Sequence, residues 1–181
     1  MRIFYGLLFA ITLGISKTLP KKVSRIIYTN VSQTFNAEFL QTNIVLDPSR
    51  HFLDVDILIK KALNAPHLRT VLEGYFKNRM SFKLNKIFPI CTIKRYQLTH
   101  PVVAIVLKKF EELSNLKRCC PIPAGKYYLN RLGFTQADTP FLASFAGTNV
   151  TWILAVTTYD KIPEIGLVNI GHFILQAYFS N

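Results

Sequence analysis

The sequence predicts a mainly β protein, a sandwich or barrel of about seven or eight short strands with one inserted helix. Several stretches alternate apolar and polar residues with a period of two, which gives each strand one apolar face. Between Cys91 and Cys119 the apolar residues instead recur at helical spacing. Because 50% of the 181 residues are hydrophobic, one domain can bury its own core, and a disordered chain is excluded.

The clearest strand pattern lies between residues 53 and 84. Apolar and polar residues alternate in 53–59, 68–76 and 80–84, with Asn78-Arg79 available as a hairpin turn. Earlier in the chain, residues 23–28 predict a short strand. The apolar phase shifts by one residue near Leu40, which predicts either a bulge or a turn between two strands. These one-sided strands are typical of an antiparallel sheet that faces a core.

A helix is predicted after Cys91. Thr99 is suited to be its N-cap, and Pro101 falls in the first turn, where a missing N–H costs nothing. The apolar stripe consists of Val103, Val106, Leu107, Phe110 and Leu113. Strands follow at 126–134, 151–159 and 172–179. Pro163, Gly166 and Gly171 favour turns, and they predict a non-strand connector between the last two strands.

Residues 1–16 predict a signal peptide, and residues 17–181 a single domain. Arg2 precedes an apolar run that ends at small residues near Ser16, the order found in secretory leaders. A membrane anchor, the alternative, needs about 20 apolar residues, and this run breaks earlier, at Lys17. Asn30 and Asn149 each begin a glycosylation sequon. We therefore expect a secreted, extracellular glycoprotein without stable membrane insertion.

The three cysteines predict one disulfide and one remaining thiol in an oxidising compartment. Cys119 and Cys120 are adjacent and cannot readily pair with each other, so both are candidate partners for Cys91. A zinc site is not expected, because no paired Cys-x-x-Cys or nearby His spacing accompanies them. No metal or cofactor is predicted.

The formal net charge is +12, from 22 Lys and Arg against 10 Asp and Glu. The basic residues are scattered in pairs such as Lys60-Lys61 and Lys108-Lys109, and no groove-reading motif accompanies them. Nucleic acid is therefore not an expected partner. A secreted basic surface fits anionic lipid head groups, glycans or acidic cell surfaces better.

Enzyme chemistry is not predicted. None of the four histidines belongs to a nucleophile elbow or a His-Glu-x-x-His motif, and no glycine-rich phosphate loop is present. Asp54 and Asp56 share one strand face and could act as a carboxylate pair, but they are better interpreted as the solvent side of an alternating strand.

The sequence contains 14 Phe and 8 Tyr, while only 18% of its residues are charged. Two interpretations are open: some apolar side chains line a cavity between the sheets, or they all fill an ordinary aromatic-rich core.

The stretch from Val71 to Tyr128 resembles a large insect family of secreted domains of unknown function. That family is related to the CheB-type chemosensory proteins and to the lipid-recognition (ML-type) fold of the ganglioside activator. The resemblance is carried by an aromatic-rich strand before Cys91, a helix, Ser114-Asn115, Cys120-Pro121 and Gly125-x-Tyr127-Tyr128. It implies an immunoglobulin-like antiparallel β-sandwich that opens between its sheets to hold a lipid or another hydrophobic ligand. It also implies that Cys91 pairs with Cys120, which leaves Cys119 as the extra thiol.

The sequence departs from the family pattern in two places. Members usually carry a cysteine shortly after the first strand, where this chain has Ser32-Gln33-Thr34, and an aspartate before the first matched cysteine, where it has Pro89-Ile90. The absent cysteine removes a bridge, and it puts the connectivity of Cys119 in doubt.

Two functional hypotheses follow. The first is a secreted, non-enzymatic protein that binds a lipid or other hydrophobic ligand between its sheets and acts in chemosensory or pheromone response. Its expected lining residues are Phe76, Phe82, Leu84, Phe110, Trp152 and Leu154. The alternative is a secreted interaction module with a filled core, which binds a receptor or an anionic glycan through its basic surface.

Overall fold

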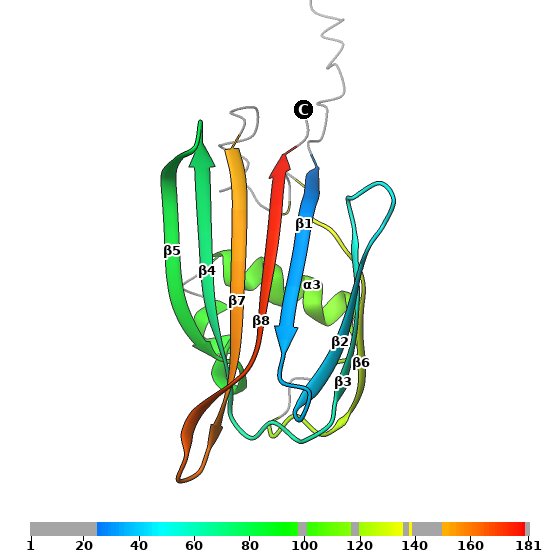
Figure 1. Ribbon diagram of the computed structural model, residues 1–181, viewed down its shortest axis with the longest axis vertical. Helices are drawn as coiled ribbons and strands as arrows, with labels where there is room; N and C mark the ends of the chain where they lie inside the picture. Colours follow the sequence, from blue (N-terminus) through cyan, green and yellow to red (C-terminus); the bar gives the residue numbers. More distant parts are fainter. Residues whose placement is uncertain (1–24, 98–100, 117–119, 136–137, 139–149, 180–181) are drawn as a thin grey trace, which may run out of the picture.

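The computed structural model describes residues 25–97, 101–116, 120–135, 138 and 150–179. These residues contain eight strands and a helical segment between the fifth and sixth strands (Figure 1). The strands are β1 (Ile26–Phe35), β2 (Leu40–Leu46), β3 (Leu53–Ile59), β4 (Pro66–Phe76), β5 (Arg79–Pro89), β6 (Gly125–Leu132), β7 (Val150–Ile162) and β8 (Gly166–Phe179). The helical segment comprises η1 (Ile90–Thr92), α2 (Lys94–Gln97) and α3 (Pro101–Leu113). Among the described residues, no helix has the length and apolar character needed to cross a membrane.

The strands form two separate antiparallel sheets. One has five strands in the order β1-β8-β7-β4-β5, and the other has three in the order β2-β3-β6. Figure 1 shows the five-stranded sheet broadside, with β2, β3 and β6 in a second layer beside β1. The predicted mainly β sandwich with a helix after Cys91 is therefore confirmed. The barrel alternative is wrong because no described strand of one sheet pairs with a strand of the other, and an isolated bridge between Arg25 and Thr135 links their edges.

The strand register brings apolar residues onto the inner face of the five-stranded sheet. Leu72 on β4 lies opposite Leu84 on β5 and Leu154 on β7, and Leu154 in turn lies opposite Leu175 on β8. Directly paired residues of neighbouring strands project to the same side, so these four leucines share one face. Across the layers, the buried Tyr28 hydroxyl of β1 donates to the Leu132 carbonyl of β6 at 3.4 Å.

Two hydrophobic clusters fill the sandwich. The larger cluster contains Tyr28, Leu53, Leu72, Leu129, Trp152 and Leu175 among its buried members. The smaller contains Leu40, Ile59, Leu63, Ile122 and Ile170. Beside the smaller cluster, the ring of Phe35 lies on Gly171, where an added Cβ would come within 1.9 Å of the ring. The strand therefore needs glycine at this position.

Some strand boundaries differ from those expected, and the turn alternative near Leu40 is confirmed. The strand expected at 23–28 is β1 and runs to Phe35. Gly166 to Gly171 is part of β8, because β7 and β8 pair as far as Ile162 opposite Gly166, so the expected connector is wrong. Residues 77 and 78, both with positive φ, form the β4–β5 turn one residue earlier than expected. The phase shift near Leu40 reflects a turn at residues 36–39, where Asn36 Oδ1 accepts from the Glu38 N–H at 3.0 Å.

Candidate functional site

The candidate site is the inner face of the five-stranded sheet where α3 covers it. In Figure 1 α3 crosses behind β7, β8 and β1, and its end lies close to β6. Ser114, just after α3, forms an isolated bridge with Leu129 of β6. The helix and the three-stranded sheet thus lie side by side over the same face.

On the sheet side, aromatic and aliphatic side chains of β5 and β7 meet. The rings of Phe82 and Trp152 pack edge to face, with centroids 5.9 Å apart and an interplanar angle of 62°. Gly74 of β4 lies opposite both residues, and an added Cβ would come within 2.9 Å of Trp152 Cζ3. The missing side chain at Gly74 therefore makes room for the indole. Leu84 and Leu154 continue this surface, with the buried Leu72 between them.

On the helix side, the predicted stripe faces the core but is only half-buried. Phe110 and Leu113 pack against the larger hydrophobic cluster. Between residues 103 and 113, no side chain of α3 is fully buried. Phe82, Leu84 and Leu154 opposite are likewise half-buried. At this boundary Leu72 and Trp152 are thus buried, whereas the helix stripe and Phe82, Leu84 and Leu154 remain partly exposed.

The C-terminal end of α3 is attached to β6 by polar side chains. Ser114 Oγ donates to the Phe110 carbonyl at 2.6 Å, which satisfies a carbonyl of the last turn. Asn115 Nδ2 donates to the Lys126 carbonyl at 3.2 Å, and its Oδ1 accepts from the Tyr128 N–H at 2.8 Å. The Asn115 amide therefore makes the kind of paired hydrogen bonds with the β6 backbone that a neighbouring strand would make.

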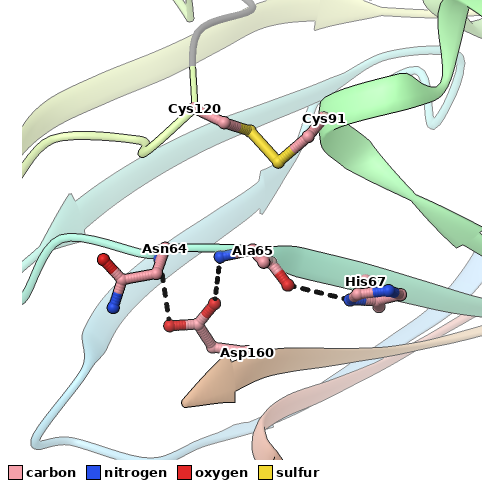
Figure 2. The surroundings of a disulfide bond; sticks show 6 residues. All are labelled: Asn64, Ala65, His67, Cys91, Cys120 and Asp160. Atoms are coloured by element: carbon pink, nitrogen blue, oxygen red, sulfur yellow. Dashed lines mark hydrogen bonds between the residues drawn. A yellow bond between two sulfur atoms is a disulfide. The ribbon is translucent and has the colours of Figure 1, made fainter. Parts of the chain in front are cut away.

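The other end of the helical segment is attached by a disulfide. Cys91 in η1 is bonded to Cys120, which precedes the loop into β6 (Figure 2). This is the pairing that the resemblance implies, and it resolves the choice that residue spacing had left open. Cys119 lies outside the described residues. The bridge and the Asn115 contacts thus fix the chain on both sides of α3.

A buried carboxylate supports the start of β4 below the disulfide (Figure 2). Asp160 is 1% exposed and accepts hydrogen bonds from the backbone N–H groups of Asn64 (3.1 Å) and Ala65 (2.9 Å). His67 Nδ1 lies 2.8 Å from the Ala65 carbonyl oxygen. Because backbone donors bind both carboxylate oxygens, Asp160 orders the turn into β4.

A third attachment joins the outer side of α3 to residue 138. Lys109 Nζ lies 3.1 Å from Asp138 Oδ1, and both side chains are mostly buried. Asp138 Oδ2 also accepts from the Thr135 N–H and hydroxyl, each at 2.8 Å. Burial alone would raise the pKa of Asp138, but the Thr135 hydrogen bonds and Lys109 outweigh it and lower the pKa below its ordinary value. Asp138 is therefore a carboxylate at neutral pH.

The structure brings together five of the six residues expected to line a ligand site. Phe82, Leu84, Phe110, Trp152 and Leu154 all belong to the larger cluster or pack against it. Phe76 does not join them: it ends β4 and is 39% exposed.

The two glycosylation candidates and the carboxylate pair also have definite positions. Asn30 is exposed on β1, and Asn149 lies outside the described residues. Asp54 Oδ1 accepts from the Arg131 N–H at 2.7 Å, and Asp56 is exposed. In the described part of the chain, no three His, Cys, Asp or Glu side chains gather as a metal site would require.

Sequence reasoning missed the residues that position the helix. Asn115 entered only through the family pattern, no sequence pattern marks Asp138, and the signal at Gly74 was overlooked. A glycine inside an alternating strand does indicate a close approach of another group, and Gly74 fits that rule.

Comparison with known proteins identifies one family model. The model described as "Protein of unknown function (DUF1091)" matches residues 69–146, somewhat less than half of the 181-residue chain. The match includes most of β4, β5, the helical segment and β6, and so contains both bonded cysteines and Asn115. The helix and its three attachments therefore fall within the matched region.

No curated protein matches the chain. Among solved structures, the comparison matches one described as "Crystal structure of protein from Archaeoglobus fulgidus". The two share 6% identity over 85% of this chain and 98% of that chain, with a TM-score of 0.24.

Proposed function

We propose that the protein is a secreted, non-enzymatic binder of a lipid or another hydrophobic ligand, which is held between α3 and the five-stranded sheet. The observation that carries the proposal is the half-buried apolar boundary between helix and sheet. Phe110 on α3 and Phe82, Leu84 and Leu154 on the sheet all pack toward one cluster without being fully buried. A hydrophobic ligand between them would remove the remaining apolar surface from water, at about 25 cal/mol per Å².

The attachments of α3 support the same role. A disulfide holds the chain before the helix, and Asn115 holds its C-terminal end on β6. Between these attachments, Phe110 and Leu113 pack against the larger hydrophobic cluster, and Lys109 is paired with Asp138 in the turn after β6. Apolar contacts have no fixed direction, so a ligand can replace some of them while both ends stay in place.

The biological setting of the proposal comes from the resemblance and the sequence. The resemblance to CheB-type chemosensory proteins and to the ML-type lipid-recognition fold suggests that the ligand is a cuticular lipid or pheromone. The disulfide and the predicted leader suggest secretion. Asn30 is exposed, as a glycosylation acceptor must be.

Native mass spectrometry of protein secreted from eukaryotic cells tests this function. We expect a co-purified hydrophobic small molecule, or stoichiometric uptake of a fluorescent fatty acid by the emptied protein. The variant Leu154→Trp adds bulk under the helix and should lower this uptake, whereas Ile165→Ser, at an exposed turn, should not. A protein that carries no lipid and takes up no probe would refute the proposal.

The second candidate is an interaction module that binds a receptor or an anionic glycan through its basic surface. The net charge of +12 favours it, because a strong positive field attracts acidic surfaces. Retention on heparin that collapses in moderate salt, together with no uptake of fatty acid, would select this function over the first.

A further inference from the structure

The β4–β5 turn carries an exposed group of apolar and basic residues that the proposed ligand site does not use. It consists of residues 76–81, Phe-Lys-Asn-Arg-Met-Ser, here called the hairpin tip. All six residues are exposed, and Phe76, Lys77, Arg79, Met80 and Ser81 line an open depression. In Figure 1 the hairpin tip lies at one end of the molecule, opposite the β7–β8 turn.

The backbone of the hairpin tip holds its side chains in a fixed arrangement. Lys77 and Asn78 have φ values of 48° and 61°, the conformation of a tight two-residue hairpin turn. Phe76 and Arg79 are therefore direct cross-strand partners, and Tyr75 pairs with Met80. Lys77 Nζ lies 5.4 Å from the centre of the Phe76 ring. Two apolar side chains and two cations thus share one short turn.

The charge of the hairpin tip has a single sign. No acidic residue occurs between Gly74 and Phe82. Among the described residues, neither Lys77 nor Arg79 lies within ion-pair distance of a carboxylate. Glu73, the acid before this stretch, is paired with Lys83 at 2.8 Å. The tip therefore presents two cations to any anionic surface that it meets.

We propose that the hairpin tip docks the protein on membranes that contain anionic lipids. Phe76 and Met80 enter the boundary between head groups and acyl chains, while Lys77 and Arg79 contact lipid phosphates. A stable protein partner would bury about 800 Å² on each side, which a turn of six residues does not provide. A fluid bilayer needs no shape complementarity and accepts an apolar pair flanked by cations. This docking surface is separate from the helix-covered site and does not depend on the ligand proposed there.

Vesicle co-sedimentation of the full secreted chain tests the proposal. The probe is phosphatidylcholine vesicles with and without phosphatidylserine. The wild type is expected to sediment with the anionic vesicles, and to do so less as salt is raised. Replacing both cations (Lys77→Gln with Arg79→Gln) should weaken partitioning roughly 25-fold, because each basic residue near such a surface contributes about fivefold. Phe76→Ser with Met80→Ser should also reduce it.

The matched control is Ile165→Ser with Leu167→Ser. These side chains are 72% and 54% exposed at the opposite hairpin, beside Glu164. The control should sediment as the wild type does, and circular dichroism should show every variant folded, since all the replaced residues are exposed. The proposal would be overturned if the control lost as much vesicle partitioning as the tip variants, or if both tip variants partitioned like the wild type. It would also be overturned if the wild type bound equally to vesicles without phosphatidylserine. Tip variants that no longer bind heparin but still partition into anionic vesicles would overturn it as well.

Discussion

Replacing both bonded cysteines (Cys91→Ala with Cys120→Ala) is expected to lower the free energy of unfolding. The loss should be a large fraction of the total free energy of unfolding of a typical domain. The two cysteines are 29 residues apart in the sequence. In the loop-closure model, a bridge over that separation removes unfolded-state entropy worth about 3.6 kcal/mol at 25 °C. For a domain of this size, such a loss corresponds to a Tm lower by about 7–14 °C.

Urea unfolding provides the assay, because Trp152 is the only tryptophan in the chain and is 5% exposed, so its emission reports the core directly. Cys119→Ala is the matched control and should leave the midpoint unchanged. The reasoning would be refuted if the double variant were as stable as the wild type, or if Cys119→Ala caused the loss and Cys120→Ala did not.

Three further predictions concern the helix-covered site. Gly74→Ala should destabilise the fold by about 1–3 kcal/mol, because the new methyl group presses on Trp152; thermal unfolding measures the loss. Asn115→Ala should cost about 1–2 kcal/mol and speed amide hydrogen exchange at Tyr128, because two hydrogen bonds to β6 disappear. Asp138→Asn should lower stability by about 1 kcal/mol at neutral pH, because it breaks the pair with Lys109.

Each of these predictions has its own control or contrary outcome. Gly125→Ala should be nearly neutral, because its Cβ would meet nothing closer than 3.8 Å; equal loss at Gly74 and Gly125 would contradict the account. Asn115→Asp keeps the acceptor for Tyr128 but places a carboxylate oxygen beside the Lys126 carbonyl oxygen, so it should gain no stability over Asn115→Ala while still protecting the Tyr128 amide from exchange. Exchange at Tyr128 as fast in Asn115→Asp as in Asn115→Ala would contradict the assigned bond.

The pH dependence of the Asp138 prediction has a definite sign. The folded pKa is lower than the unfolded one, so the stabilisation is fully present above about pH 4 and is lost as the pH falls through the folded pKa. The gap between the wild type and Asp138→Asn should therefore close on acidification. A gap that stayed constant from neutral to strongly acidic pH would contradict the role given to this carboxylate.

Alternation and helical spacing predicted most of the fold because each strand and α3 bury one face. The strand at 53–59 and the helix stripe through Phe110 and Leu113 both follow from that rule. The rule failed at Gly166 and Gly171, where glycine was interpreted as punctuation. Glycine is needed at position 171 of β8 because the Phe35 ring occupies the space of a side chain. This contact joins β1 and β8, which are neighbours in the sheet but far apart in the sequence, so local sequence does not show it.

The candidate site was predictable where it depends on apolar pattern and unpredictable where it depends on tertiary contacts. Alternation placed Phe82, Leu84, Trp152 and Leu154 on one face, as the register shows. The same alternation also included Phe76, although Phe76 is the last residue of β4 and is 39% exposed. Which cysteine pairs with Cys91 required the family resemblance, because adjacent cysteines are equivalent by spacing.

The central claim is that a hydrophobic ligand binds between α3 and the sheet, and energy transfer from Trp152 to a bound fluorescent fatty acid tests it most directly. Trp152 is the only donor tryptophan and packs against Phe82 within the site. Titration with cis-parinaric acid should quench Trp152 emission saturably at one probe per chain, and Leu154→Phe, which adds bulk without adding a second tryptophan, should weaken this binding. Quenching that never saturates, or no energy transfer at all, would contradict the account.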